Sequence, residues 1–275
     1  MSKKQSIIYL LGHSRSGSTV LCMHLGRRSN LFYAGELKKF NRSFHARRCT
    51  CGEAAKDCDF WGPLISQEMK YFNRGIDKDI SILLFVKNMK SLFFGNSRKL
   101  IEEEKAFLEN LAIYKEEKNQ AVSIMIDSSK SLNRLVMYRE MKDLEVYTIY
   151  LERDLRANIA SFVKRGNGVL NSYLRLKING ALIKRYLSRN KINHIKIKYE
   201  DFISQPEETI QNILHKFNIK DEGVSASENE TVHLISGNEK TRFRTTTGNY
   251  KIDQSANLQD PFSNWQKNIL RLLGI

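Results

Sequence analysis

Two glycines and four hydroxyl-bearing side chains are concentrated in Gly12–Thr19, with the sequence GHSRSGST. This segment lies between Ile7–Leu11, an apolar run that predicts a buried strand, and Val20–Arg28, which predicts a helix. Glycines let the backbone approach an anion, and the first N–H groups of a helix face it with the positive end of the helix dipole. The pattern therefore predicts a phosphate-binding loop.

One position separates this loop from that of the nucleotide hydrolases. Their pattern, G-x-x-x-x-G-K-[ST], has a lysine where this chain has Ser18. That lysine reaches the β- and γ-phosphates, so its absence argues against ordinary ATP or GTP chemistry. A nucleotide kinase or other phosphotransferase stays as an alternative, with Asp127 as its magnesium ligand, and magnesium-dependent ATP turnover would support it.

The elements around the loop predict the fold class. Apolar runs that predict strands are Ile7–Leu11, Val122–Ile126, Val146–Leu151 and Ile195–Tyr199. Helical segments lie between and after them, among them Leu132–Met141, Leu170–Asn190 and Pro206–Phe217. Strands that alternate with helices along the chain pair with one another in parallel, and the helices form right-handed crossovers between them. We therefore expect one α/β domain over residues 1–275, a P-loop-like three-layer fold with a central parallel sheet flanked by helices, and ligands beyond the carboxyl ends of the strands.

Two segments together resemble the sulfotransferases that use 3′-phosphoadenosine 5′-phosphosulfate (PAPS). The loop Arg15-Ser16-Gly17-Ser18-Thr19 resembles their 5′-phosphosulfate loop. Arg153, in the segment 150–156, and Ser161 eight residues later resemble their 3′-phosphate segment. A guanidinium fork and a hydroxyl about two helical turns further on suit one phosphate. The resemblance implies PAPS as donor, bound by Arg15, Ser16, Gly17, Ser18, Thr19, Arg153, Ser161, Tyr199 and Arg242.

Three further segments extend the resemblance over roughly residues 7 to 242. The segment 127–130, Asp-Ser-Ser-Lys, resembles a strand-end motif of the bacterial and carbohydrate-type branches. The segment 199–202, Tyr-Glu-Asp-Phe, resembles an element after a later strand, and 233–242 resembles a late loop that closes over the nucleotide. The branch implied is bacterial, carbohydrate-type or tyrosylprotein-type.

Sulfuryl transfer needs a base and cations. The resemblance implies Glu36 as the base that deprotonates the acceptor, with Arg15 and Lys130 neutralising charge on the leaving oxygen. His13 and His24 are alternative bases, because cytosolic members of the family use a histidine. No metal is needed in this scheme, and the acceptor stays open among sugars, lipids, tyrosine and small phenols, with either a hydroxyl or an amine as nucleophile.

A basic segment carries four potential zinc ligands. They are the sulfurs of Cys49, Cys51 and Cys58 and the imidazole of His45. The C-x-C spacing is tighter than the commoner C-x₂₋₄-C. The pair Phe60-Trp61 that follows favours a loop held by apolar burial. A similar Cys-x-Cys-Gly…Cys-x-Phe-Trp stretch occurs in many bacterial sulfotransferase-like sequences. We therefore expect packed, reduced thiols and no metal at this segment.

Charge and hydropathy bound the remaining function classes. The chain of 275 residues has 45 Lys and Arg against 30 Asp and Glu, a formal net charge of +15. Such charge suits a polyanionic ligand or nucleic acid, but no zinc-finger, helix-turn-helix or RNA-binding signature accompanies it. A nucleic-acid-binding protein is therefore the second alternative. No run approaches the roughly 20 apolar residues of a membrane span, and we expect a cytoplasmic protein.

Overall fold

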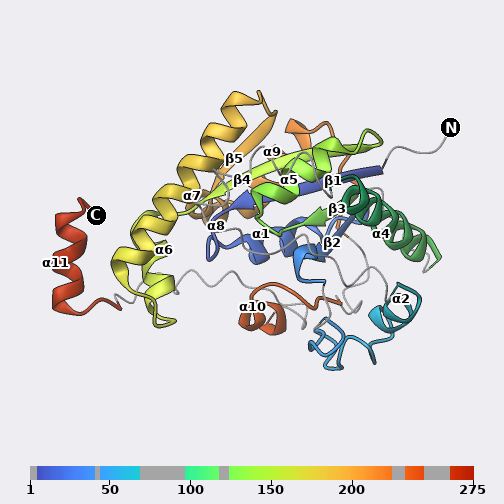
Figure 1. Cartoon of the computed structure of the whole chain (residues 1–275), viewed down its shortest axis with the longest axis horizontal. Helices are drawn as coiled ribbons and strands as arrows, with labels where there is room; N and C mark the ends of the chain where they lie inside the picture. Colours follow the sequence, from blue (N-terminus) through green and yellow to red (C-terminus); the bar gives the residue numbers. More distant parts are fainter. Residues whose placement is uncertain (1–4, 41–43, 69–96, 118–123, 225–232, 245–260) are drawn as a thin grey trace.

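A five-stranded sheet lies at the centre of the protein (Figure 1). The computed structural model describes residues 5–40, 44–68, 97–117, 124–224, 233–244 and 261–275. The strand order is β2-β3-β1-β4-β5, and every neighbouring pair is parallel. The strands are β1 Gln5–Gly12, β2 Leu31–Gly35, β3 Ile124–Asp127, β4 Leu144–Glu152 and β5 His194–Lys198. Four of them match predicted runs, although Val122 and Ser123 lie outside the described residues, and β2 was not predicted.

Helices connect the strands and follow the last one. Their bounds are α1 Ser18–Leu25, α2 Trp61–Glu68, α4 Ser97–Glu117, α5 Leu132–Glu140, α6 Leu155–Val163, α7 Val169–Arg189, α8 Tyr199–Ser204, α9 Pro206–Lys216, α10 Glu239–Arg244 and α11 Asn264–Leu272. The helix predicted after the loop begins two residues early, at Ser18, and ends at Leu25. The strand predicted to reach Tyr199 ends at Lys198, because Tyr199 opens α8.

Each face of the sheet has its own apolar core. Alternate side chains of a strand point to opposite faces, so Ile7, Tyr9 and Leu11 of β1 join one cluster while Ile8 and Leu10 join the other. The first cluster includes side chains from α4, α5 and α7, and the second includes side chains from α1, α8 and α9. The predicted α/β architecture, a parallel sheet between helical layers, is confirmed.

The C-terminal helix α11 has its own anchor at one end of the molecule (Figure 1). Leu270 and the preceding Phe262 are buried against Phe162 of α6 and Leu176 of α7. Ser263 and Gln266 form a capping box that fixes the start of the helix. Within the described ranges, no helix combines the length and the apolar character needed to cross a bilayer.

A buried ion network fixes the end of β3. Asp127, Glu104 and Arg134 are all at most 1% exposed. Arg134 donates from Nε to Asp127 Oδ2 at 2.9 Å and pairs through Nη2 with Glu104. Tyr138 also donates to Asp127 Oδ2, and Oδ1 accepts from the backbone N–H of Leu37 at 3.1 Å. The network therefore joins α4, α5 and β3 to the residue that follows Glu36.

Replacing Arg134 by methionine should strongly destabilise the protein. Two buried carboxylates would lose their cation, which typically costs ~3–5 kcal/mol of unfolding free energy. Urea denaturation of Arg134→Met measures this loss. Arg139→Met is the matched control, since Arg139 is exposed on the same helix and its loss should cost no more than about 0.5 kcal/mol. Equal losses in the two variants would show that the network contributes little to stability.

Candidate functional site

The carboxyl ends of the parallel strands meet at one edge of the sheet (Figure 1). Gly12 at the end of β1 lies opposite Leu151 of β4, and Gly35 at the end of β2 lies opposite Asp127 of β3. The segments that follow these strands carry the predicted chemistry. They are the glycine loop after β1, Glu36 after β2, Lys130 after β3 and Arg153 after β4. The topology thus gathers the sequence-predicted residues at the place where such sheets bind ligands.

The glycine loop depends on both of its glycines. Gly12 has φ +151°, and a Cβ there would lie 2.5 Å from the carbonyl oxygen of Leu151. Gly17 has φ +87°, and a Cβ there would collide with the ring of Tyr199. Ser16 is fully buried and donates from Oγ to the carbonyl of His13 at 2.8 Å. The loop is therefore closed on itself and brings its backbone tight against β4 and α8.

Ser18 and Thr19 form the first turn of α1, where backbone N–H groups have no partner within the helix. Both residues are 5% exposed. Thr19 Oγ1 accepts from the backbone N–H of Asn238 at 3.0 Å. The turn is thus fixed from outside by a late segment of the chain.

Arg15 joins the two segments predicted to bind the two ends of one nucleotide. Its Nε donates to Ser161 Oγ of α6 at 3.0 Å. Arg153 donates from Nη1 to the carbonyl of Arg15 at 2.9 Å, and its guanidinium carbon lies 4.7 Å from the centre of the Tyr199 ring. Four predicted donor-binding residues (Arg15, Arg153, Ser161 and Tyr199) therefore lie in one connected group.

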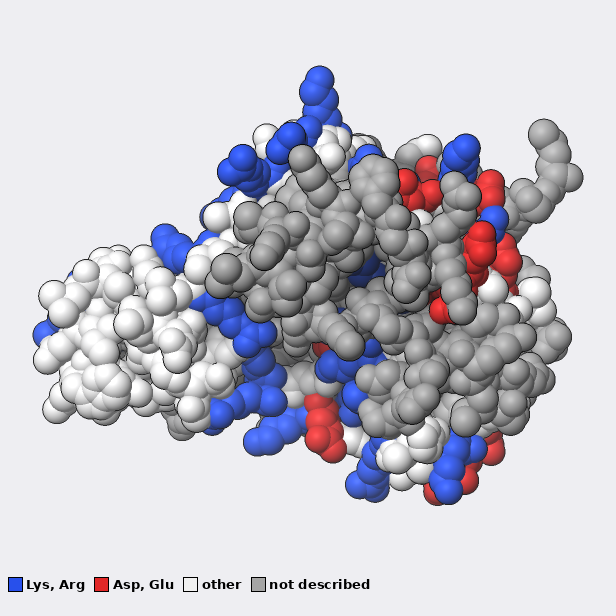
Figure 2. All heavy atoms as spheres, viewed as in Figure 1, with Lys and Arg blue, Asp and Glu red and all other residues white. Residues whose placement is uncertain are grey.

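Positive charge accumulates at this group. Burial lowers the pKa of Arg15, and the neighbouring charges of Arg165 and Arg153 lower it further. Figure 2 shows Lys and Arg side chains gathered on the face of the molecule between α6 and α10. Cations held close together repel one another, and a bound polyanion removes that repulsion. The group therefore has the electrostatics of a phosphate site.

Glu36 lies between two lysines in a largely buried position. Its side chain is 10% exposed, with Lys130 Nζ 3.0 Å from Oε1 and Lys39 Nζ 2.8 Å from Oε2. Lys130 also donates to the carbonyl of Ser128 at 2.6 Å and has φ +60°. The left-handed backbone of Lys130 aims its side chain back at Glu36, so the predicted base and one predicted cation are in direct contact.

The lysines decide the protonation state of Glu36. Burial raises the pKa of its carboxyl, but Lys130 and Lys39 outweigh burial and hold the pKa at about 2. The group is therefore an ionised carboxylate across the whole neutral range. It can accept a proton at once, although its low pKa makes it a weak base until a ligand draws the lysines away.

A late segment ties Glu36 to the glycine loop. Glu36 donates its backbone N–H to Ser236 Oγ at 2.6 Å, while Asn238 two residues on contacts Thr19. Sequence reasoning missed Ser236 and Lys39. Lys39 could have been found, because it stands three residues after Glu36. No local pattern marks Ser236, which reaches Glu36 only through the fold.

The structure separates the two alternative bases. His13 lies in the glycine loop, 3.5 Å from Asn179 of α7 (Nδ1 to Nδ2), and burial lowers its pKa. His24 lies in the last turn of α1, and its Nε2 contacts Glu207 at 2.8 Å. His24 therefore faces α9 at the far end of α1, away from the strand ends, whereas His13 stays within reach of them.

Arg242 and His45 lie in surroundings that the sequence did not predict. Arg242 donates from Nη1 to the carbonyls of Leu234 at 2.6 Å and Arg48 at 3.2 Å, so in this structure it braces two backbone segments. His45 was expected to lie with the three cysteines if they formed a metal site. It is exposed instead, and His233 occupies that place. The sequence distance of the true neighbour, 175 residues from Cys58, explains the error.

Comparison with solved structures identifies the fold. The "Sulfotransferase Domain from the Curacin Biosynthetic Pathway" superposes with a TM-score of 0.51 over 99% of both chains, at 17% identity. This chain has the sulfotransferase fold. Two other sulfotransferase structures also match. A domain of the Synechococcus PCC 7002 olefin synthase has a TM-score of 0.47 and 17% identity, covering 100% of this chain and 96% of that one. STF9 from Mycobacterium avium has a TM-score of 0.47 and 10% identity, covering 79% of this chain and 64% of that one. No protein-family model and no curated protein matches the sequence.

Within the sulfotransferase fold, the kinase alternative loses its proposed metal ligand. Both carboxylate oxygens of Asp127 accept hydrogen bonds, Oδ2 from Arg134 and Oδ1 from Ser129 N–H at 2.9 Å. The side chain is fully buried. An aspartate engaged in this way acts as a structural link and is not free to bind magnesium.

Proposed function

We propose that this protein transfers a sulfuryl group from PAPS to a hydroxyl or amine of an acceptor. One observation carries the proposal. The loop predicted to hold the 5′-phosphosulfate and the residues predicted to hold the 3′-phosphate are joined through Arg15, which bonds to both Arg153 and Ser161. PAPS carries a 3′-phosphate and ATP does not, so a second phosphate site beside the loop favours this donor.

The reaction is a single in-line displacement. The acceptor oxygen or nitrogen forms a bond to sulfur while the bond between sulfur and the bridging phosphate oxygen breaks. The acceptor proton passes to Glu36, and the products are the sulfated acceptor and 3′-phosphoadenosine 5′-phosphate (PAP). Arg15 and Lys130 neutralise the charge that develops on the departing oxygen. None of these roles needs a metal ion, and positioning with electrostatics supplies the rate, as in phosphoryl transfer.

The Glu36–Lys130 contact links donor binding to the activation of the base. In the free protein Lys130 is held by Glu36 and by the Ser128 carbonyl. An anionic donor in the loop competes for Lys130, and each contact it gains weakens the hold on Glu36. Donor binding thereby raises the basicity of Glu36 at the moment when a base is needed.

The whole chain forms the catalytic unit in this proposal. The solved sulfotransferase domain of the curacin pathway matches 99% of both chains, which supports one domain over residues 1–275. The acceptor is identified by incubating the protein with sulfur-labelled PAPS and a cell extract, followed by mass spectrometry of the labelled product. Label transfer from PAPS supports the proposal, whereas magnesium-dependent transfer from γ-labelled ATP would favour the kinase alternative.

PAP should stabilise the protein far more than AMP does. The two nucleotides differ only in the 3′-phosphate, for which Arg153 and Ser161 are the proposed ligands. At ~100 times its dissociation constant, PAP should add roughly 2.7 kcal/mol to the unfolding free energy. Thermal unfolding with each nucleotide at equal concentration measures the difference. Equal shifts from PAP and AMP would contradict a dedicated 3′-phosphate site.

A further inference from the structure

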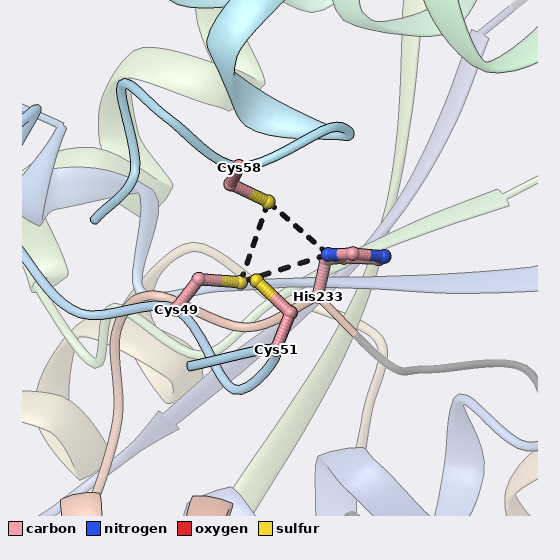
Figure 3. Close-up of side chains that lie close together, drawn as sticks. All are labelled: Cys49, Cys51, Cys58 and His233. Atoms are coloured by element: carbon pink, nitrogen blue, oxygen red, sulfur yellow. Dashed lines mark hydrogen bonds between the residues drawn. The ribbon is translucent and has the colours of Figure 1, made fainter. Parts of the chain in front are cut away.

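Three cysteines and a histidine, from two segments far apart in the sequence, meet outside the proposed catalytic group. Figure 3 shows Cys49, Cys51, Cys58 and His233 directed at one another. Their four ligand atoms all lie within 4.8 Å of one another. The four cysteines of the chain are free, so no disulfide accounts for the arrangement.

The distances suit a tetrahedral ion. Cys58 Sγ lies 3.6 Å from Cys49 Sγ, and His233 Nδ1 lies 3.1 Å from Cys58 Sγ and 3.7 Å from Cys49 Sγ. Around tetrahedral zinc, bonds of ~2.3 Å to sulfur and ~2.05 Å to nitrogen separate two sulfurs by about 3.8 Å and a sulfur from a nitrogen by about 3.6 Å. Cys49, Cys58 and His233 are therefore already within a few tenths of an ångström of the spacing that zinc needs, and Cys51 Sγ lies within 4.8 Å of the other three ligand atoms.

The surroundings hold the ligands in place. Residues 49–53 form a tight turn, in which the backbone N–H of Cys49 donates a hydrogen bond to the carbonyl of Glu53 at 2.7 Å. The turn brings Cys51 back toward Cys49. The ring of His233 stacks on Phe60, with 5.4 Å between ring centres. The carbonyl of His233 accepts from Trp61 Nε1 at 2.9 Å. Aromatic packing thus holds the imidazole with Nδ1 toward the sulfurs.

We propose that Cys49, Cys51, Cys58 and His233 bind one structural zinc ion. Three thiolates and one imidazole fill all four tetrahedral positions, and a closed site of this kind stabilises a fold without taking part in the reaction. Binding displaces the thiol protons to solvent. The proposal departs from our sequence-based expectation, which considered only ligands within one segment.

The zinc site is connected to the edge of the sheet where the proposed catalytic residues lie. Leu234, next to His233, donates its N–H to Thr50 Oγ1 at 2.8 Å, so the zinc ligands join residues 49–58 to the start of the segment 233–238. Further along the same segment, Ser236 contacts Glu36 and Asn238 contacts Thr19. The ion therefore anchors the segment that holds both the proposed base and the glycine loop.

Elemental analysis of the full chain tests the proposal. Protein purified under reducing conditions without chelators should carry one zinc per chain. His233→Ala and Cys58→Ser should lose most of it, whereas His45→Ala should retain it, because His45 is exposed and outside the cluster. If His45→Ala lost as much zinc as His233→Ala, the metal would be adventitious and the proposal wrong.

Wild-type protein alone gives a second decisive measurement, in case a ligand variant does not fold. After chelation and return to reducing buffer, Co²⁺ should produce thiolate-to-cobalt absorption and the intense visible bands of tetrahedral cobalt, and zinc should abolish both. Substoichiometric zinc together with no cobalt–thiolate absorption and freely reacting thiols would overturn the proposal. Neither readout depends on sulfuryl transfer, so failure here leaves the proposed function untouched.

Discussion

Replacing Glu36 by glutamine should lower turnover by ~10²–10⁴-fold and leave the affinity for PAP nearly unchanged. Glutamine keeps the size and polarity of the side chain but cannot accept the acceptor proton. Arg15 lies in the glycine loop, Arg153 follows β4 and Ser161 lies on α6, and the contacts among them do not involve Glu36. Steady-state kinetics with saturating donor measures the first quantity, and calorimetric titration with PAP measures the second.

Lys39→Met separates the chemistry of Glu36 from its ion pairs. Lys39 is 34% exposed and contacts Glu36 Oε2, whereas Lys130 contacts the other oxygen. This variant removes one ion pair but keeps the carboxylate, so it should retain activity within the same order of magnitude. If Lys39→Met lost as much turnover as Glu36→Gln, the ion pairs and not the base would explain the loss.

The pH profile distinguishes Glu36 from His13. Because its pKa is about 2, Glu36 is ionised from mildly acidic pH upward, and a Glu36 base predicts no loss of kcat/KM as pH falls from neutrality to that range. A His13 base must be neutral. Burial lowers the pKa of His13 from its ordinary 6.5, so activity would fall once pH drops below that lowered value. Full activity in Glu36→Gln, together with an acidic limb in the wild-type profile, would assign the role to His13.

The sequence predicted the sheet and the glycine loop because both depend on local patterns. β1 is buried on both faces and is therefore continuously apolar, and two positive-φ positions in the loop require glycine. The strand β2 was missed although LFYAG is an apolar run like those of the predicted strands, because so short a run fits a helix end or a loop equally well. Its position at the sheet edge is set by pairing with β3, which is distant in sequence.

The parts of the site that sequence could not supply are long-range contacts. Lys130 was placed at a strand end, but its ion pair with Glu36 spans 94 residues. Ser236 lies 200 residues from Glu36, and His233 lies 175 residues from Cys58. Each pair is brought together by the order of strands or by a late loop crossing over the sheet edge. Spacing within one segment therefore favoured His45 as a partner of the cysteines, although the fold places it on the surface.

Replacing Arg153 by methionine should abolish most of the preference for PAP over AMP. The guanidinium of Arg153 donates to the carbonyl of Arg15, which in turn bonds to Ser161, and it lies over the Tyr199 ring. From there it can form charged hydrogen bonds to a 3′-phosphate. Hydrogen bonds to charged groups are worth about 1.5–3 kcal/mol, so PAP affinity should fall on the order of 10- to 100-fold. AMP lacks the 3′-phosphate and should lose much less. Calorimetric titration of wild type and variant with both nucleotides gives the ratio directly.

Arg156→Met is the matched control for charge. Arg156 stands three residues later, is exposed on α6, and its guanidinium lies 5.6 Å from the centre of the Phe262 ring. Both variants lower the net charge by one. If binding depended on general attraction by the +15 chain, the two would weaken PAP and AMP alike, and added salt would erase the difference from wild type. A local 3′-phosphate site predicts the opposite: Arg156→Met keeps the wild-type ratio of PAP to AMP affinity, and only Arg153→Met brings that ratio toward one.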